Sequence, residues 1–220
     1  MKNHKPYYTQ NGFTLIELLI SLLISSILML GIMNAYINQQ KIFLSQKQLV
    51  EMQQNIRAAL SIMSKDIRLA GHDPYGAYNA GIIAAGNGYS GDFLAFTYVA
   101  DNDGKDNNHN GNIDERGELR TIKYSFYDAY GDGDDDIGRK VDAGYNQSII
   151  ENVKNCKVQG VNLFSYFNKN GDLMSFPITN LLDIRAVKIS ITAIPDSKKA
   201  DNASQTCTLT TTVRCRNLEL

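Results

Sequence analysis

The chain has 220 residues, of which 43% are hydrophobic and 20% are charged. Its 22 basic and 23 acidic residues give a formal net charge of −1, so it lacks the basic excess with which proteins bind nucleic-acid phosphates. With three histidines and no nucleophile elbow, phosphate-binding glycine loop or zinc signature, the sequence predicts neither an enzyme nor a nucleic-acid-binding protein. Catalytic pairs among the many carboxylates stay open as an alternative.

A long apolar segment begins close to the N-terminus. Residues 13–33 are uncharged except for Glu17, and about 20 residues at 1.5 Å each span a bilayer core of roughly 30 Å. The leader that precedes this segment, residues 1–12, contains Lys2 and Lys5 but no acid. The positive-inside bias therefore predicts a single-pass helix, with the leader in the cytoplasm and the rest of the chain across the membrane.

Glu17 is the most unusual residue of this segment. A carboxylate inside a spanning helix costs roughly 2.5 to 3.5 kcal/mol on insertion scales and is rare unless a partner neutralises it. An ionisable residue in such a place is therefore a functional candidate. The alternative is an uncleaved signal anchor that carries a stray acid.

The basic leader followed by Gly12-Phe13-Thr14-Leu15-Ile16-Glu17 resembles the class III signal of type IV pilins and type II secretion pseudopilins. This resemblance implies that a prepilin peptidase cleaves after Gly12 and methylates the new N-terminus at Phe13. It also implies that Glu17 pairs with the N-terminal ammonium of a neighbouring subunit, so that assembly offsets the cost of the buried acid. The implied partners are the peptidase, other minor pilins, the major pilin and an inner-membrane assembly platform, with the pilus at the cell surface as the final location.

The helical pattern continues beyond the membrane segment. Apolar residues recur at spacings of three and four, which is typical of one buried stripe on a helix. The stripe consists of Leu49, Met52, Ile56, Ala59, Leu60, Met63, Ile67 and Ala70. Gly71 ends the pattern and Pro74 follows it, as expected where a helix stops. The sequence thus predicts one helix on the order of 85 Å long, with a spanning part at residues 13–33 and an amphipathic part at residues 34–70.

Residues 71–220 are expected to form one globular domain rich in strands. β-branched and aromatic residues between turn signals predict strands at residues 93–99, 119–127, 158–167, 186–194 and 208–213. The run Asn168-Lys169-Asn170-Gly171-Asp172 is typical of a hairpin turn. Strands that follow one long helix and are joined by short turns favour an α+β, pilin-like fold, with an antiparallel sheet packed on the amphipathic part of the helix.

The order of these segments carries a second resemblance. The helix end at residues 63–71, the strand-like runs at residues 119–124 and 161–167, and the terminal Arg214-Cys215-Arg216-Asn217-Leu218 are similar to those of PilW-type minor pilins and their relative, the J-type minor pseudopilin of type II secretion. The resemblance implies a minor pilin that helps to prime or cap a type IV pilus. A J-type pseudopilin is the alternative, because the two machines share the signal and much of the fold.

An acidic loop is the one candidate metal site in the sequence. It reproduces the start of the D-x-[DN]-x-[DN]-G calcium loop, but its twelfth position holds Gly117 in place of the usual glutamate. The candidate ligands are Asp106, Asn108, Asn110, Asn112 and Asp114, and residues 132–136 form a second acidic loop. Calcium would add another function, a calcium-dependent binding or adhesion module at the tip. Otherwise Asp, Asn and Gly only form solvated turns, and no other cofactor is expected.

The three cysteines all lie on the exported side of the predicted topology, where disulfides persist. Cys207 and Cys215 flank one predicted strand, and eight steps of about 3.3 Å place them roughly 26 Å apart, too far for a bridge. A meander would bring Cys156 and Cys207 to the same edge of the sheet, so we expect that pair to form the disulfide. A redox function is disfavoured because no Cys-x-x-Cys spacing occurs.

Overall fold

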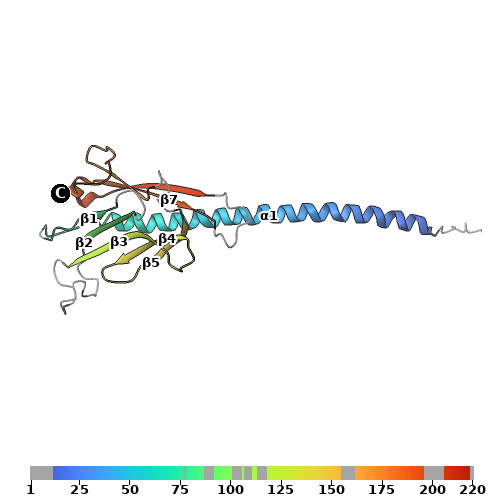
Figure 1. The fold of residues 1–220 in the computed structure, drawn as a ribbon, viewed down its shortest axis with the longest axis horizontal. Coiled ribbons are helices and arrows are strands. Elements are labelled where there is room, and N and C mark those ends of the chain that lie inside the picture. Colours follow the sequence, from blue (N-terminus) through green and yellow to red (C-terminus); the bar gives the residue numbers. More distant parts are fainter. Residues whose placement is uncertain are drawn as a thin grey trace, which may run out of the picture. The chain divides into compact units, whose positions relative to one another are not determined.

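The computed structural model describes residues 12–76, 78–86, 92–100, 106, 111–112, 118–154, 162–195 and 206–218. Within these ranges a 53-residue helix precedes an eight-stranded antiparallel sheet (Figure 1). The elements are α1 (Leu15–Ile67), β1 (Ile82–Ala85), β2 (Phe93–Val99), β3 (Leu119–Tyr127), β4 (Asp135–Val141), β5 (Gln147–Val153), β6 (Phe164–Phe167), η1 (Leu181–Asp183), β7 (Ala186–Ala193), β8 (Cys207–Arg214) and η2 (Arg216–Leu218). The predicted α+β architecture is confirmed.

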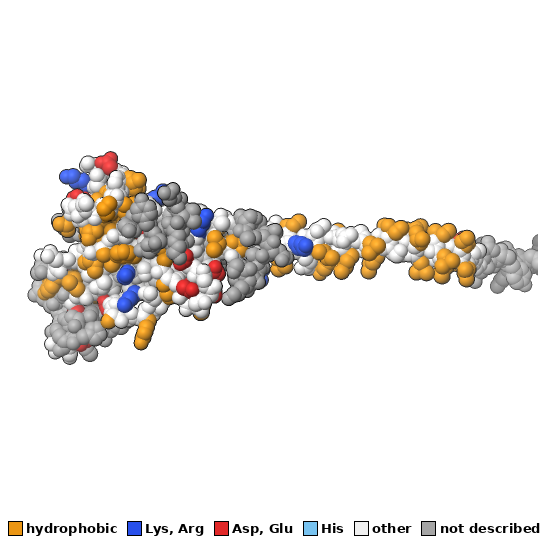
Figure 2. All heavy atoms as spheres, viewed as in Figure 1, with side chains coloured by type: hydrophobic (Ala, Val, Ile, Leu, Met, Phe, Trp, Pro, Cys, Tyr) orange, Lys and Arg blue, Asp and Glu red, His pale blue; other side chains and the backbone are white. Residues whose placement is uncertain are grey.

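The chain forms two units, Met1–Lys47 and Gln48–Leu220. In the first unit, residues 12–44 are all exposed, and apolar side chains predominate on the helix from Phe13 to Met33 (Figure 2). By length and composition the helix is able to cross a membrane. A continuous apolar surface of this kind is unfavourable in water, so this unit requires lipid or the apolar helices of other chains.

In the second unit, the C-terminal part of α1 packs on the sheet and fills one side of its core. The predicted stripe is confirmed, since Leu49 is half-buried and the other members are buried. Each fully buried side chain of the size of Ile56 or Met63 contributes about 1.5 to 3 kcal/mol to folding. The helix ends at Ile67 rather than at residue 70, because the amides of Leu69 and Ala70 bond to carbonyls three residues back instead of four. Leu69 N–H donates to Asp66 O at 2.9 Å, and Ala70 N–H donates to Ile67 O at 3.1 Å.

The sheet has two parts that meet at one point. One part runs β1-β2-β3-β4-β5, and the other contains β7 with β6 on one side and β8 on the other. β5 and β7 are registered only at Val153 and Ala193, next to Asn152, whose φ of 56° bends β5. Two hydrogen bonds of 2.8 Å close this junction, from Lys154 N–H to Thr192 O and from Ile194 N–H to Asn152 O.

A polar cluster joins α1 to β3 and β4 inside the second unit. Asp66 Oδ2 accepts hydrogen bonds from Tyr124 Oη and from Arg139 Nε, both at 2.6 Å. A carboxylate that is removed from water needs such partners. Burial, followed by the Asp66 carboxylate, raises the pKa of Tyr124 far above its usual value, so this hydroxyl stays a donor. The cluster fixes how α1 is rotated on the sheet.

The strands agree in part with the expectations. β2 and β3 have the predicted bounds, and β7 and β8 end within one residue of them. β6 is shorter than predicted and covers only Phe164–Phe167, while residues 155–161 lie outside the described part of the chain. The turn after β6 is confirmed: Gly171 has a φ of 85°, and Asn168 N–H donates to Asp172 O at 3.1 Å. The sequence did not predict β1, β4 or β5.

Candidate functional site

The start of α1 forms a small hydrogen-bonded site around Glu17. The Thr14 backbone N–H and the Thr14 hydroxyl both donate to Glu17 Oε2 at 2.8 Å. In return, Glu17 N–H donates to Thr14 Oγ1 at 3.4 Å. This reciprocal pair is a capping box, in which a threonine and a glutamate three residues later satisfy amides that have no partner within the helix.

Sequence reasoning missed this box although its signal, Thr-x-x-Glu, was visible. From the sequence, Glu17 was interpreted only as a charge in an apolar segment and not as a helix cap. In the structure Glu17 also has a local role, because its carboxylate lies in the first turn, where it interacts favourably with the positive end of the helix dipole. Thr14 is therefore a further residue of the site.

Glu17 keeps one oxygen available for a partner. Both Thr14 donors bind Oε2, and none of the described residues donates a hydrogen bond to Oε1. The nearby serine hydroxyls are already used within the helix: Ser21 donates to Leu18 O at 2.9 Å and Ser25 to Ser21 O at 2.7 Å. Glu17 is the one charged residue from Phe13 to Met33, and its second carboxylate oxygen is suited to a cation from another molecule.

The peptide bond between Gly12 and Phe13 is open to solvent. The space where a side chain would begin at Gly12 has no heavy atom within 4 Å, and Phe13 is 92% exposed. A residue without a side chain also allows a close approach of another backbone or of catalytic groups. The peptide bond about one helical turn before Glu17 is therefore accessible to another molecule.

The candidate calcium loop lies mostly outside the described residues. Asn108, Asn110 and Asp114 belong to the undescribed part. Asp106 Oδ2 accepts a hydrogen bond from Gly111 N–H at 2.8 Å, and Gly111 has a φ of 99°, which glycine adopts readily. Within the described ranges no group of three potential metal ligands forms, so calcium binding stays a prediction.

Asp128, just before the second acidic loop, holds the turn that leads into that loop. Asp128 Oδ1 accepts from Gly131 N–H at 2.6 Å, and Asp128 Oδ2 accepts from Gly133 N–H at 3.1 Å. These bonds lower the pKa of Asp128, with the Gly133 amide as the largest cause. Asp128 thus acts as a turn former through side-chain bonds to backbone amides, which is the alternative role considered for the acids of this region.

Cys207 begins β8 and Cys215 follows its end, and among the described residues neither thiol is bridged to the other. Cys207 and Cys215 are both buried, and burial raises the pKa of Cys215 to about 12, so this thiol is a poor nucleophile. Cys156 lies outside the described residues, and the predicted Cys156–Cys207 disulfide stays a prediction.

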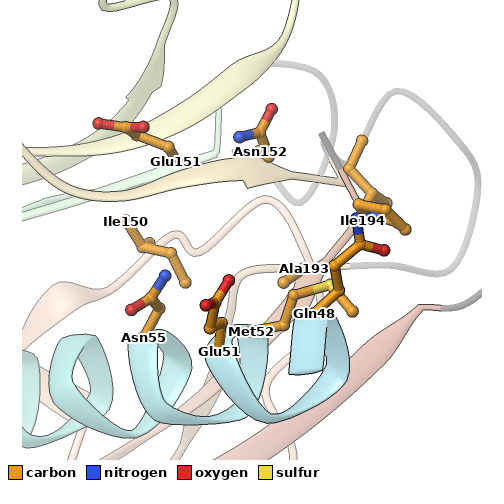
Figure 3. Close-up of a pocket in the computed structure, with 10 residues that line it drawn as sticks. Gln48, Glu51, Met52, Asn55, Ile150, Glu151, Asn152, Ala193 and Ile194 are labelled. Carbon is orange, nitrogen blue, oxygen red and sulfur yellow. The ribbon is translucent and has the colours of Figure 1, made fainter. Parts of the chain in front are cut away.

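A pocket of about 220 Å³ opens beside the junction of β5 and β7 (Figure 3). Its lining contains two carboxylates, Glu51 on α1 and Glu151 on β5, and no histidine, cysteine or hydroxyl side chain. Figure 3 shows Ile150 pointing toward the helix and Glu151 on the opposite side of β5.

Residues 8–33 match the family model of the prokaryotic N-terminal methylation motif. The matched segment contains the Gly12–Phe13 bond and the Thr14–Glu17 box. No curated protein and no solved structure matches the chain. Together with the long apolar helix and the antiparallel sheet, the motif supports a membrane-anchored prepilin of the type IV pilin or pseudopilin class, of the kind that a prepilin peptidase processes and that assembles with other pilins.

Proposed function

We propose that the chain is a minor pilin of a type IV pilus, cleaved by a prepilin peptidase after Gly12 and methylated at Phe13. The observation that carries this proposal is Glu17, an acid held by Thr14 in the first turn of an exposed apolar helix with one carboxylate oxygen available. The matched motif at residues 8–33 supports the proposal, because it includes the Gly12–Phe13 bond next to this acid.

In this mechanism the new N-terminal ammonium of one subunit binds Glu17 of its neighbour. The charge pair offsets the cost of burying each charge among apolar helices, so the acid is tolerated best in the filament. The exposed apolar side chains of residues 12–44 then pack against the same part of other subunits. The lysines of the leader keep the N-terminus in the cytoplasm and the β-rich unit on the outer side of the inner membrane.

A minor pilin is an assembly factor that helps to prime or cap the filament. This choice rests on the order of helix, sheet and terminal Arg214–Leu218 segment, which is similar to that of PilW-type proteins. The J-type pseudopilin of a type II secretion system is the alternative function of the same class, since the N-terminal chemistry is the same in both.

The proposal is tested by comparing the full chain with Glu17→Ala and Gly12→Leu variants in cells. The Gly12→Leu variant should keep its leader, which mass spectrometry detects as an intact Met1, while Glu17→Ala should lose the leader and still fail to enter filaments. Glu17→Gln is the matched control that removes the charge but keeps a side-chain oxygen for Thr14. An intact Met1 in the native protein, or normal assembly of Glu17→Ala, would disprove the assignment.

A second function, calcium-dependent binding at the filament tip, is favoured by one observation. The Asp106 carboxylate and the Gly111 amide close the loop at 2.8 Å, between the first and sixth positions of the calcium-loop pattern. The ligands would be Asp106, Asn108, Asn110, Asn112 and Asp114, and calcium would order them for contact with a partner.

A further inference from the structure

The edges of the sheet are not equally protected. β1, at one edge, has only four residues, has a register shift between Ile82 and Ala84, and contacts η1. Short, bulged and covered edges are the usual means by which proteins prevent strand addition. β6 is also satisfied on its outer side, since Phe164 N–H donates to Asp92 Oδ2 at 3.0 Å and Met174 N–H donates to Tyr166 O at 2.8 Å.

Within the part of the chain that the structure describes, β8 has none of these protections. It is eight residues long, and it pairs with β7 in one unbroken register from Ala186–Arg214 to Ala193–Cys207. Its sequence, Cys207-Thr-Leu-Thr-Thr-Thr-Val-Arg214, contains no proline and no lysine. Among the described residues, β7 is the only strand that pairs with it. A long, regular edge strand is a template for another strand.

The register shows which backbone groups β8 directs outward. Cys215 N–H donates to Arg185 O at 2.9 Å, and hydrogen-bonded pairs alternate along an antiparallel ladder. The odd-numbered residues of β8 therefore bond to β7. The N–H and C=O groups of Thr208, Thr210 and Thr212 consequently point away from β7.

The hydrogen bonds on the other side of β7 lead to the same assignment of outward-pointing groups on β8. Ser190 N–H donates to Leu163 O at 2.9 Å and Lys154 N–H donates to Thr192 O at 2.8 Å. These even-numbered residues of β7 use their backbone groups on the side of β5 and β6, so only its odd-numbered residues are directed toward β8. Donors and acceptors therefore alternate along the outer edge of β8.

We propose that the outer edge of β8 binds an extended segment of another filament subunit by strand addition. An alternating row of main-chain donors and acceptors is complementary to an extended peptide. The partner segment must cover Thr208 to Thr212, so it has about five residues or more in β conformation. This inference rests on the proposed function, because it requires that the chain meets other subunits in a filament.

The side chains of β8 define the partner further. Thr208, Thr210 and Thr212 are exposed on one face of the sheet, whereas Leu209 is half-buried on the other. A matching strand therefore alternates polar and small apolar side chains and carries no run of charge. A second copy of this chain is the less suitable occupant, because two β8 edges form a closed pair and a minor subunit is surrounded by other subunits.

The test compares Thr210→Pro with Thr210→Val in the full chain. Proline removes the outward N–H at position 210 and leaves the ladder with β7 intact, as on other edge strands, whereas valine keeps the N–H and changes only the side chain. Both variants should lose the leader and reach the membrane normally. We expect at least a tenfold lower incorporation of Thr210→Pro into filaments, measured by quantitative immunoblotting of sheared filaments, and normal incorporation of Thr210→Val. Equal incorporation would overturn the inference.

If Thr210→Pro is poorly folded, a photo-crosslinking residue at position 210 tests whether another strand binds at the outer edge of β8. The same residue at Lys123, an exposed position on β3, is the control, because β3 is paired on both sides. Crosslinks from position 210 to one extended segment of another subunit support strand addition. Crosslinks only to a second copy of the chain, or none, overturn it. If the wild-type chain itself is neither processed nor incorporated, the proposed function fails instead.

Discussion

Thr14 and Glu17 show how one pair of side chains serves both local structure and assembly. The Thr14 hydroxyl donates to Glu17 and accepts from the Glu17 amide, while the Thr14 N–H donates to the same carboxylate oxygen. The box therefore directs the acid toward the helix start before any partner arrives. Because Oε2 is used for this purpose, pairing with a neighbouring subunit is left to Oε1.

Replacing Thr14 by valine tests that positioning role. Thr14→Val removes both hydroxyl bonds but keeps the N–H bond to Glu17, and loss of such a cap costs about 0.5 to 2 kcal/mol. We expect normal cleavage after Gly12 and a several-fold lower incorporation into filaments, a smaller defect than that of Glu17→Ala. Thr14→Ser, which keeps the hydroxyl, should behave as wild type. Wild-type incorporation of Thr14→Val would contradict the role.

Calcium binding belongs to the same scale, because it depends on individual oxygen ligands. If the loop from Asp106 binds the ion, calcium at 100 times its dissociation constant stabilises the folded chain by about 2.7 kcal/mol. A thermal melt of the full chain in detergent should therefore shift upward with calcium and return after chelation. Asp106→Ala should abolish the shift, and Asp172→Ala, in a turn elsewhere, should not. If calcium does not raise the melting temperature of the wild-type chain, the acids of this loop only form turns and do not bind the ion.

At the scale of elements, the strands that the sequence identified differ in kind from those it did not. β2 and β3 are rich in aromatic and β-branched residues, so composition alone predicts them. β4 begins with two acids and contains Gly138, both unfavourable in strands. The structure explains the glycine: a side chain there would begin 2.6 Å from the Tyr127 ring, so this cross-strand contact requires Gly138.

The sequence also did not predict the junction of β5 and β7, which joins the two parts of the sheet. It depends on one registered pair, Val153 with Ala193, whose members lie 40 positions apart in the printed sequence, and no local pattern specifies such a pairing. The pocket next to it and the unprotected edge of β8 follow from this topology. By contrast, the helix, its buried stripe and the matched N-terminal motif depend on local periodicity and spacing, which explains why they were predictable.

The contact between α1 and the sheet yields a prediction on stability. Asp66→Ala leaves Arg139 and Tyr124 without the carboxylate that they share at 2.6 Å, and breaking a buried pair costs about 3 to 5 kcal/mol. We expect the lower end of this range, since the Arg139 side chain is 24% exposed. Denaturant unfolding of the full chain in detergent measures the loss. Tyr124→Phe, which keeps the ion pair, should cost only about 1 kcal/mol, and an equal loss in both variants would contradict the account.

For the whole molecule, the division into two units separates stability from assembly. The buried core residues, from Met52 to Cys215, all belong to Gln48–Leu220, whereas residues 12–44 are exposed and contribute no buried surface to this core. The first unit therefore depends on its surroundings, lipid or neighbouring helices, and the second on its own packing.

A chain that begins at Gln48 should accordingly fold without detergent. The remaining 20 residues of α1, from Gln48 to Ile67, are held by the stripe that packs on the sheet, because most helical stability in proteins comes from such packing. We expect this fragment to be monomeric by light scattering and to unfold cooperatively within a few degrees of the full chain. The same fragment with Ile56→Ala should be destabilised by about 2 to 5 kcal/mol, because Ile56 is fully buried. A fragment that aggregates or lacks a cooperative transition would show that the first unit contributes to folding as well as to anchoring.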